Sequence, residues 1–540
     1  MFMKLVLLLC LEIPMWVAAA NVQNFSELRK RFESYYTDNK VKVRGITVGG
    51  WLVTEPYITP SLYHKAMDTA GNESSSIIDE YTMCKALGYD KARSLMADHF
   101  ASWITEDDFK QIKEDGFNLV RIPIGYWAWK EKHETNGYIN GIQFEDPYVS
   151  DGLQIEYLNK ALNWSKSYGL NVWIDLHGLP GSQNGFDNSG ERILYGELGW
   201  LRKPNSKELS RAVLNDIFAK YMNNEEYGDT IVGIEIANEP LGGKIDMDKI
   251  VEFYYETFQD FKDAQSAGDN TTFVIHDAFQ GIGFWNEHFN TAYNNVSSKY
   301  YNLTVPEYAS TSVLVDHHHY EVFTDFQLGH TPLDRMIDIM NYGESLAKEQ
   351  KYHPSLVGEW SGAITDCATW LNGVGMGARY DGGYYKSTNF SSDLESKPLG
   401  ECKSQRPVDE WSEEYKNQVR QFIEAQLASY SANSAGWIFW NWKTENATEW
   451  DYLKLKEANL FPTPLDKYEY FQSNGSMVES FSNSLFERTR SSSHQKSTSS
   501  SKSASGGSGG MTIRGGTNSF LWKWWVGIAA VGVGALCVLA

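Results

Sequence analysis

The sequence predicts a single (β/α)8 TIM barrel, in which eight parallel strands alternate with helices around a closed sheet. Three observations lead to this prediction. Eight short apolar runs alternate with stretches of helical periodicity between residues 43 and 442. Polar or charged residues follow most of these runs, at the strand ends where such barrels carry their chemistry. The first run breaks at paired glycines without a glycine-rich phosphate turn, which disfavours a doubly wound sheet.

The expected strands are apolar along most of their length, as strands buried on both faces are. Among the helices, the clearest start is Thr105, a capping residue with Asp108 three positions later. In chain order, the expected strands cover residues 43–52, 117–125, 170–176, 231–236, 272–275, 312–315, 356–357 and 436–442. The expected helices cover residues 80–101, 105–115, 156–168, 206–222, 247–264, 333–350 and 413–432.

The N-terminus has the order of a secretory signal peptide. Lys4 precedes an apolar run, and Ala18-Ala19-Ala20 offers a small-residue cut site. We therefore expect residues 1–20 to be removed, with a buried N-terminal helix as the alternative. Residues 21–487 then form the barrel domain.

The C-terminus changes composition twice. Residues 488–510 are rich in Ser, Lys, Thr and Gly, so they bury no core and are expected to be a flexible stalk. Residues 511–540, a polar spacer and an apolar tail, match a GPI-attachment signal with Ser508 as the attachment residue. A membrane span is the alternative. These ends predict a protein of the cell surface, held at the plasma membrane or in the cell wall.

The composition of the chain limits the classes of molecule that it is expected to bind. The net charge of −21 argues against nucleic acid, because no basic face is available to bind phosphates. An aromatic content of 14% suits a neutral carbohydrate, although most of these rings are expected to fill the core. No pair of cysteines has the spacing of metal ligands, and we expect neither cofactor nor metal.

Three cysteines remain once the signal and tail are removed. We expect Cys367 and Cys402 to form a disulfide, because they flank one insertion-like segment, and Cys84 to be buried and inert. Glycosylation sequons agree with a secreted chain. They stand at Asn24, Asn72, Asn163, Asn270, Asn295, Asn302, Asn389, Asn446 and Asn474.

Two carboxylates stand at the ends of expected strands. Glu239 is the second-last residue of the stretch Gly233 to Pro240, and Glu359 is the second-last residue of the stretch Ser355 to Trp360. One carboxylate in a cleft can act as a general acid or base, and splitting an acetal usually needs a second one as nucleophile or base. Other polar or aromatic residues recur at the same rim of the barrel. They are Glu55, Arg121, His177, Asn238, His318, Tyr320 and Trp440.

Several of these residues lie in motifs that resemble glycoside hydrolase family 5. The short motifs are Asn238-Glu239-Pro240, Gly358-Glu359-Trp360, Arg121-Ile122-Pro123, Asp175-Leu176-His177-Gly178 and His317-His318-His319-Tyr320. The longer stretches 178–190 and 436–446 resemble the fungal exo-β-1,3-glucanases of that family. With its stalk and GPI signal, the chain is similar to the membrane- or wall-attached yeast form.

The resemblance implies roles for the site residues. Glu239 would be the acid/base and Glu359 the nucleophile of a retaining enzyme that needs no metal. Arg121 would orient Glu359, and Asn238 would hold the sugar 2-hydroxyl. The other implied substrate contacts are His177, His318, Tyr320, Glu55 and Asn188 around the cleaved glucose, Trp440 or alternatively Trp442 beneath it, and Phe186 with Phe323 at the entrance.

The leading hypothesis is an exo-hydrolase, expected to be monomeric, that releases glucose from the non-reducing ends of β-1,3-glucan. Two alternatives stay open. One is a glucan-remodelling transglycosylase or β-1,6-glucanase on the same barrel. The other is a non-catalytic wall protein that binds glucan, which the presence of both glutamates disfavours.

Overall fold

The computed structural model describes residues 42–132, 137–194, 196–222, 224–227, 230–266, 269, 271–290, 313–388 and 390–488. The predicted signal peptide, almost all of the predicted stalk and the predicted GPI signal lie outside these ranges. So do the sequons at Asn24, Asn270, Asn295, Asn302 and Asn389. Within the described ranges, no helix is long and apolar enough to cross a membrane.

Eight parallel strands close into a barrel, as predicted. The strands follow one another around the barrel in chain order, and the last pairs with the first. They are β1 (Val43–Thr47), β2 (Leu119–Gly125), β5 (Asn171–Gly178), β6 (Ile231–Glu235), β7 (Thr272–His276), β8 (Val313–His318), β9 (Ser355–Glu359) and β10 (Gly436–Phe439). A short hairpin of β3 (Lys130–Lys132) and β4 (Gly137–Tyr138) lies outside the barrel.

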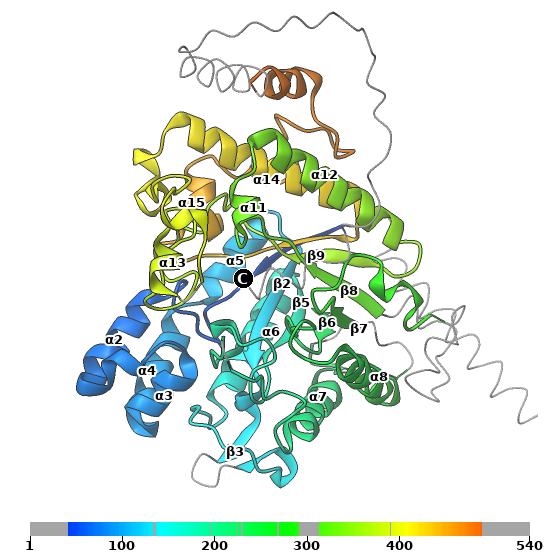
Figure 1. Cartoon of the computed structure of the whole chain (residues 1–540). Coiled ribbons are helices and arrows are strands. Elements are labelled where there is room, and N and C mark those ends of the chain that lie inside the picture. The colour runs from blue at the N-terminus through cyan, green and yellow to red at the C-terminus, as the bar shows by residue number, and fades with distance from the viewer. Residues whose placement is uncertain are drawn as a thin grey trace, which may run out of the picture.

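Helices surround the barrel, with α7 and α8 side by side and α12 packed on α14 (Figure 1). The main ones are α2 (Pro60–Ala70), α3 (Glu80–Leu87), α4 (Tyr89–Ser102), α5 (Glu106–Glu114), α6 (Leu153–Tyr168), α7 (Ser206–Tyr221), α8 (Met247–Ala264), α12 (Pro332–Glu349) and α14 (Glu413–Asn433). Shorter helices are α11 (Asp325–Leu328), α13 (Gly383–Ser387) and α15 (Tyr452–Glu457).

Several predicted boundaries differ from the structure, among them the strand predicted over residues 436–442, which ends at Phe439. The helix predicted over residues 80–101 is two helices, α3 and α4, because Gly88 between them has a φ of +70°, which ends the first helix. The first predicted strand ends at Thr47, before the paired glycines. The predicted start at Thr105 is confirmed, since Thr105 and Asp108 form a reciprocal capping box.

Toward the amino ends of the strands, the barrel interior is filled by one apolar side chain from each strand. This layer consists of Val43, Leu119, Trp173, Val232, Val274, Leu314, Leu356 and Ile438, with Ala435 beside it. Two glycines make room for it. A Cβ on Gly45 would stand 2.6 Å from Ile438, and one on Gly233 would stand 2.5 Å from Trp173. The apolar layer closes the barrel from below, so polar chemistry is confined to the carboxyl ends of the strands.

The cysteines behave as predicted. Cys367 and Cys402 form a disulfide with a Cα–Cα distance of 5.2 Å. Cys84 is free and buried, and burial raises the pKa of its thiol, so it stays protonated and unreactive. The four sequon asparagines that the structure describes, at positions 72, 163, 446 and 474, are all exposed.

Candidate active site

The two candidate carboxylates meet at the carboxyl end of the barrel. Glu359 is the last residue of β9, and Glu239 stands four residues after the end of β6. Glu239 has a φ of +49°, an unusual conformation for a residue with a side chain. Both residues are nearly fully buried, at 3% exposure for Glu359 and 6% for Glu239. The barrel therefore brings together two acids that are 120 positions apart in the sequence.

Glu359 is held by two donors. Arg121 Nη1 donates to Oε1 at 2.7 Å, and the Tyr320 hydroxyl donates to Oε2 at 2.8 Å. The Arg121 guanidinium stays charged and can only donate hydrogen bonds. The Tyr320 hydroxyl also donates, so both partners favour the ionised form of the Glu359 carboxylate, which only accepts. Both contacts fit the role that the sequence resemblance implies, an ionised and fixed nucleophile.

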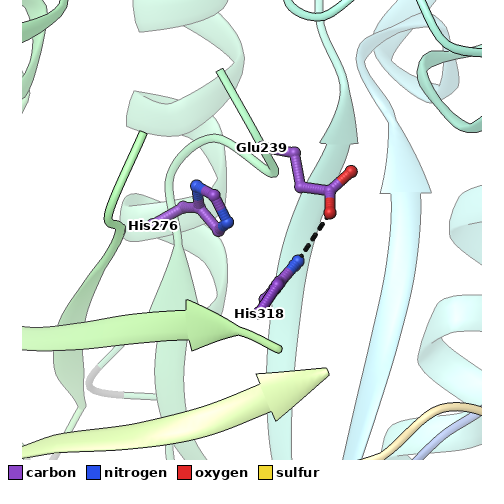
Figure 2. Close-up of side chains that lie close together, drawn as sticks. All are labelled: Glu239, His276 and His318. Carbon is purple, nitrogen blue, oxygen red and sulfur yellow. Dashed lines mark hydrogen bonds and ion pairs between the residues drawn. The ribbon is translucent and has the colours of Figure 1, made fainter. Parts of the chain in front are cut away.

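Glu239 has a partner that titrates. His318 Nδ1 lies 2.8 Å from Oε1, an interaction drawn in Figure 2, and the Asn188 amide donates to Oε2 at 2.9 Å. The same Nδ1 lies 3.4 Å from Oε2 of Glu359, so one imidazole nitrogen bridges both acids. This arrangement favours the carboxyl separation of about 5–5.5 Å found in retaining glycosidases over the about 6.5–9.5 Å of inverting ones.

The pKa shifts of the two acids are opposite to those expected if Glu239 alone held the acid proton and Glu359 were always ionised. Burial raises the pKa of Glu239, but the hydrogen bond and charge of His318 outweigh it, so the pKa is lowered. Burial raises the pKa of Glu359, opposed by His318 and Arg121. Burial lowers the pKa of His318, yet the charge of Glu359 and bonds to Asp316 and Glu239 raise it well above normal. The proton available to the acid therefore rests on His318, next to Glu239.

A layer of buried charge supports the two acids from below. Arg121, fully buried in β2, donates to Glu235 at 2.8 Å and to the Asn238 side-chain oxygen at 2.7 Å, and lies 3.2 Å from Asp175. Burial raises the pKa of Glu235 well above its ordinary value. Asp316 touches the same layer, and Gly358 leaves space for it, because a Cβ there would stand 2.1 Å from Asp316 Oδ1.

The sequence reasoning missed the carboxylates of this layer as site residues. A signal for each is present in the sequence, since a carboxylate inside an otherwise apolar strand needs a buried partner. Glu235 in β6 is such a residue. Asp175, two positions before His177, and Asp316 at the end of an apolar run are the others.

Several buried polar atoms in the site have no hydrogen-bond partner among the described residues. Three of them belong to residues with an implied sugar contact, and they are Nδ2 of Asn238, Nε2 of His177 and Oε1 of Glu55. The Asn238 oxygen is occupied by Arg121, and His177 Nδ1 is paired with Asp175 at 2.7 Å. Asn238 and His177 are thus each fixed by one atom and offer the other, as expected of groups that bind sugar hydroxyls.

Trp440, and not Trp442, belongs to the site. The Trp440 ring stacks on His177 at 5.6 Å with an interplanar angle of 7°, and its indole N–H donates to the Tyr57 hydroxyl. Trp442 is fully buried, donates to Asp108 at 2.9 Å and stacks on Tyr452. Trp440 is therefore the ring that lies beside the other candidate site residues. Tyr57 is a further site residue that the sequence reasoning did not name.

The predicted pocket-closing and entrance residues have different surroundings. Asn188 uses its amide on Glu239 rather than remaining free for a hydroxyl, so its contact differs from the one implied. Phe186 is half-buried and lies outside the buried core clusters of the described chain. Phe323 is also half-buried and packs edge-on against Tyr320 at 5.7 Å. Burial raises the pKa of Glu55 well above normal, and the negative charges of Asp187, Glu359 and Glu239 raise it further.

Two groups of donor atoms in the site are close enough together to be considered for a metal. One consists of Glu235, Asp316 and His318, and Glu235 already accepts from Arg121. In the other, a carboxylate oxygen of Glu239 and ring nitrogens of His276 and His318 lie within 4.8 Å of one another. However, His276 Nδ1 already accepts from the backbone N–H of Ala278, so Nε2 carries the proton and offers no lone pair. His318 Nδ1 is bonded to Glu239. These atoms fit the handling of a proton better than the coordination of an ion.

Comparisons with known proteins show the family to which this chain belongs. The model of the cellulase family, glycosyl hydrolase family 5, matches residues 86–373. The chain is 60% identical over 484 residues to glucan 1,3-beta-glucosidase 2 of Saccharomyces cerevisiae, covering 88% of this chain and 86% of that relative. It is 41% identical over 475 residues to glucan 1,3-beta-glucosidase 2 of Candida albicans, covering 87% and 93%.

A solved structure supports the fold. The crystal structure of rutinosidase from Aspergillus niger matches with a TM-score of 0.53 and 18% identity, covering 78% of this chain and 98% of that one. At this identity, the match bears on the barrel alone.

Proposed function

Because the chain belongs to glycosyl hydrolase family 5, we propose that it is a retaining exo-hydrolase that releases glucose from the non-reducing ends of β-1,3-glucan. The observation that carries the proposal is the pair of buried carboxylates bridged by His318 Nδ1, at 2.8 Å from Glu239 and 3.4 Å from Glu359. The two glucan 1,3-beta-glucosidase relatives supply the substrate class.

In the first step, a Glu359 oxygen attacks the anomeric carbon while the glycosidic C–O bond breaks. The proton that rests on His318, 2.8 Å from Glu239, passes to Glu239 and from there to the departing oxygen, which leaves Glu239 ionised and His318 neutral. The product is a glycosyl ester on Glu359. In the second step, Glu239 takes a proton from water, the water oxygen bonds to the anomeric carbon, and the ester bond breaks. Two inversions give net retention.

The atoms without partners define how the glucose is held. Asn238 Nδ2 is placed to donate to the 2-hydroxyl, a contact that strengthens as charge develops at the ring. His177 Nε2 and Glu55 Oε1 are available to other hydroxyls of the same sugar. Trp440 gives a flat apolar surface on which a sugar face can stack.

The exo mode requires a pocket closed beyond the cleaved glucose. Glu55, which is 4% exposed in the loop after β1, supports such a closed end. The half-buried rings of Phe186 and Phe323 suit an entrance that grips the rest of the glucan chain. We further propose that the enzyme acts as a secreted monomer held at the cell surface by a GPI anchor, and the terminal sequence signals support this location.

The test is product analysis with the secreted protein, using laminarin and a β-1,6-glucan as substrates. Glucose released first as the β-anomer from laminarin, followed by NMR, is the expected result. A Glu359→Gln enzyme made in the same way is the control. Early release of longer oligomers, preference for the β-1,6-glucan, or release of the α-anomer would contradict the proposal. A chain cut after Arg490 should be soluble and equally active, because all the site residues lie upstream.

A further inference from the structure

His276 is a buried residue beside the acid/base that the mechanism above does not use. It is the last residue of β7, has no exposed surface, and its ring meets the His318 ring edge-on at 4.4 Å and 74°. Figure 2 shows one of its ring nitrogens directed toward Glu239 and His318. A polar group in this position is costly to bury without a partner, so its presence needs a reason.

The backbone fixes which nitrogen of His276 carries the proton. Nδ1 accepts from the Ala278 backbone N–H at 3.0 Å, in a turn where Ala278 and Phe279 both have a φ of +58°. The Tyr254 hydroxyl donates to the His276 carbonyl at 3.0 Å and holds the strand end in place. Because Nδ1 is an acceptor, the neutral ring has its proton on Nε2 and can only donate there.

The Nε2–H of His276 has no hydrogen-bond partner among the described residues. A His276 ring nitrogen, a His318 nitrogen and a Glu239 carboxylate oxygen nevertheless lie within 4.8 Å of one another. One water spans such a gap, and catalytic hydrogen bonds that are long in a free enzyme tighten once substrate is bound.

We propose that His276 is a positioning residue for the acid/base, whose Nε2–H donates to the ionised Glu239 carboxylate, directly or through one water, during hydrolysis of the glycosyl-enzyme. This inference rests on the proposed function, because only that function has a second step in which Glu239 must be ionised. A neutral donor stabilises the ionised carboxylate without supplying a proton that competes with the one taken from water.

Several titratable groups surround His276 and share in the pH response. Burial lowers the pKa of His276 well below normal, and the charge of His318 adds to this effect. The ring therefore stays neutral through the working pH range. The other groups that face it are Glu239 after β6, Asp277 next in the chain, His317 from β8, Arg121 from β2 and Tyr254 from α8.

The experiment compares full-length wild type with His276→Phe and His276→Gln. Phenylalanine keeps the ring and loses the donor, whereas glutamine keeps a donor that does not titrate. The substrate is an aryl β-glucoside with a strongly acidic phenol as leaving group. Its first step needs no proton, so kcat reports the second step, in which Glu239 acts as base, and the acid limb of kcat reports Glu239 in the glycosyl-enzyme.

For His276→Phe we expect the acid limb of kcat to move up by about one pH unit, a loss of about tenfold in kcat below the limb. The acid limb of kcat/KM for the same substrate, which reports Glu359, should stay in place. His276→Gln should keep the wild-type limb. His99→Phe, which removes a buried histidine bonded to the Gly50 carbonyl, is a matched control that should not move it either.

A folded His276→Phe enzyme with the wild-type acid limb would overturn the inference. So would equal losses of kcat and kcat/KM in both variants with no movement of the limb, because that pattern indicates a packing role. If His276→Phe does not fold, a shifted limb in His276→Gln would also overturn it. Wild type that releases no phenol would overturn the proposed function together with the inference, whereas active wild type with an unmoved limb overturns the inference alone.

Discussion

Removing the Tyr320 hydroxyl tests how the nucleophile is held. This hydroxyl donates to Oε2 of Glu359 at 2.8 Å, while Arg121 occupies Oε1 at 2.7 Å. In Tyr320→Phe the ring keeps its contacts with Phe323 and Trp450, so the change is confined to one donor. Oε2 then keeps only the more distant His318 Nδ1, at 3.4 Å.

The magnitude follows from the charge on the acceptor. A hydrogen bond to an ionised group contributes about 1.5–3 kcal/mol, which corresponds to about 10- to 150-fold in a rate or equilibrium constant. Burial already raises the pKa of Glu359, and the loss of a donor to its ionised form raises it further. We therefore expect kcat/KM for laminarin to fall by about 10- to 150-fold, and its acid limb to move to higher pH by about one unit or more.

The assay is the pH profile of kcat/KM for wild type, Tyr320→Phe and Tyr63→Phe. Tyr63 is a fully buried tyrosine whose hydroxyl bonds to Thr54 at 2.9 Å, so Tyr63→Phe controls for the loss of one buried hydroxyl. It should lower stability by about 1 kcal/mol and leave the profile unchanged. Tyr320→Phe with more than half the wild-type activity and an unmoved acid limb would refute the reasoning.

Three further predictions concern the acids, the entrance and stability. Glu359→Gln should be folded and inactive. Glu239→Gln should accumulate a glycosyl-enzyme from an activated aryl glucoside, which intact-protein mass spectrometry would detect. Normal turnover by either variant would contradict the role assigned to that residue. Replacing both Phe186 and Phe323 by Ala should raise KM for laminarin about five- to thirtyfold more than KM for an aryl glucoside, and equal losses would contradict their place at the entrance. Burial raises the pKa of Glu449 from 4.5 to about 7, so its contribution to stability is complete below pH 4.5 and is lost as the pH rises through 7. Glu449→Gln should therefore remove up to about 3 kcal/mol of the wild-type loss between pH 4.5 and 8 in urea unfolding, and an unchanged loss would contradict this reading.

The sequence alone determined the barrel fold and the candidate site residues at the carboxyl ends of its strands. Each of the eight strands was located by its apolar run, although some of the strand ends differ, because a strand buried on both faces has to be apolar along most of its length. The capping pair of Thr105 and Asp108 marked a helix start, since that signal is local. The break at Gly88 was missed, because a helix and a glycine-interrupted pair of helices share the same apolar spacing.

Only the tertiary structure decided how the site residues are paired. The contacts of Arg121 with Glu359, Glu235 and Asn238 join three different strands or strand ends, and no local pattern in the sequence specifies which pairs form. The choice of Trp440 over Trp442 depended on which direction each ring takes from the same strand end. The location of the acid proton on His318, next to Glu239, follows from burial and from charges on several strands. Sequence fixes residue type and spacing, whereas these properties arise only when distant side chains share one buried volume.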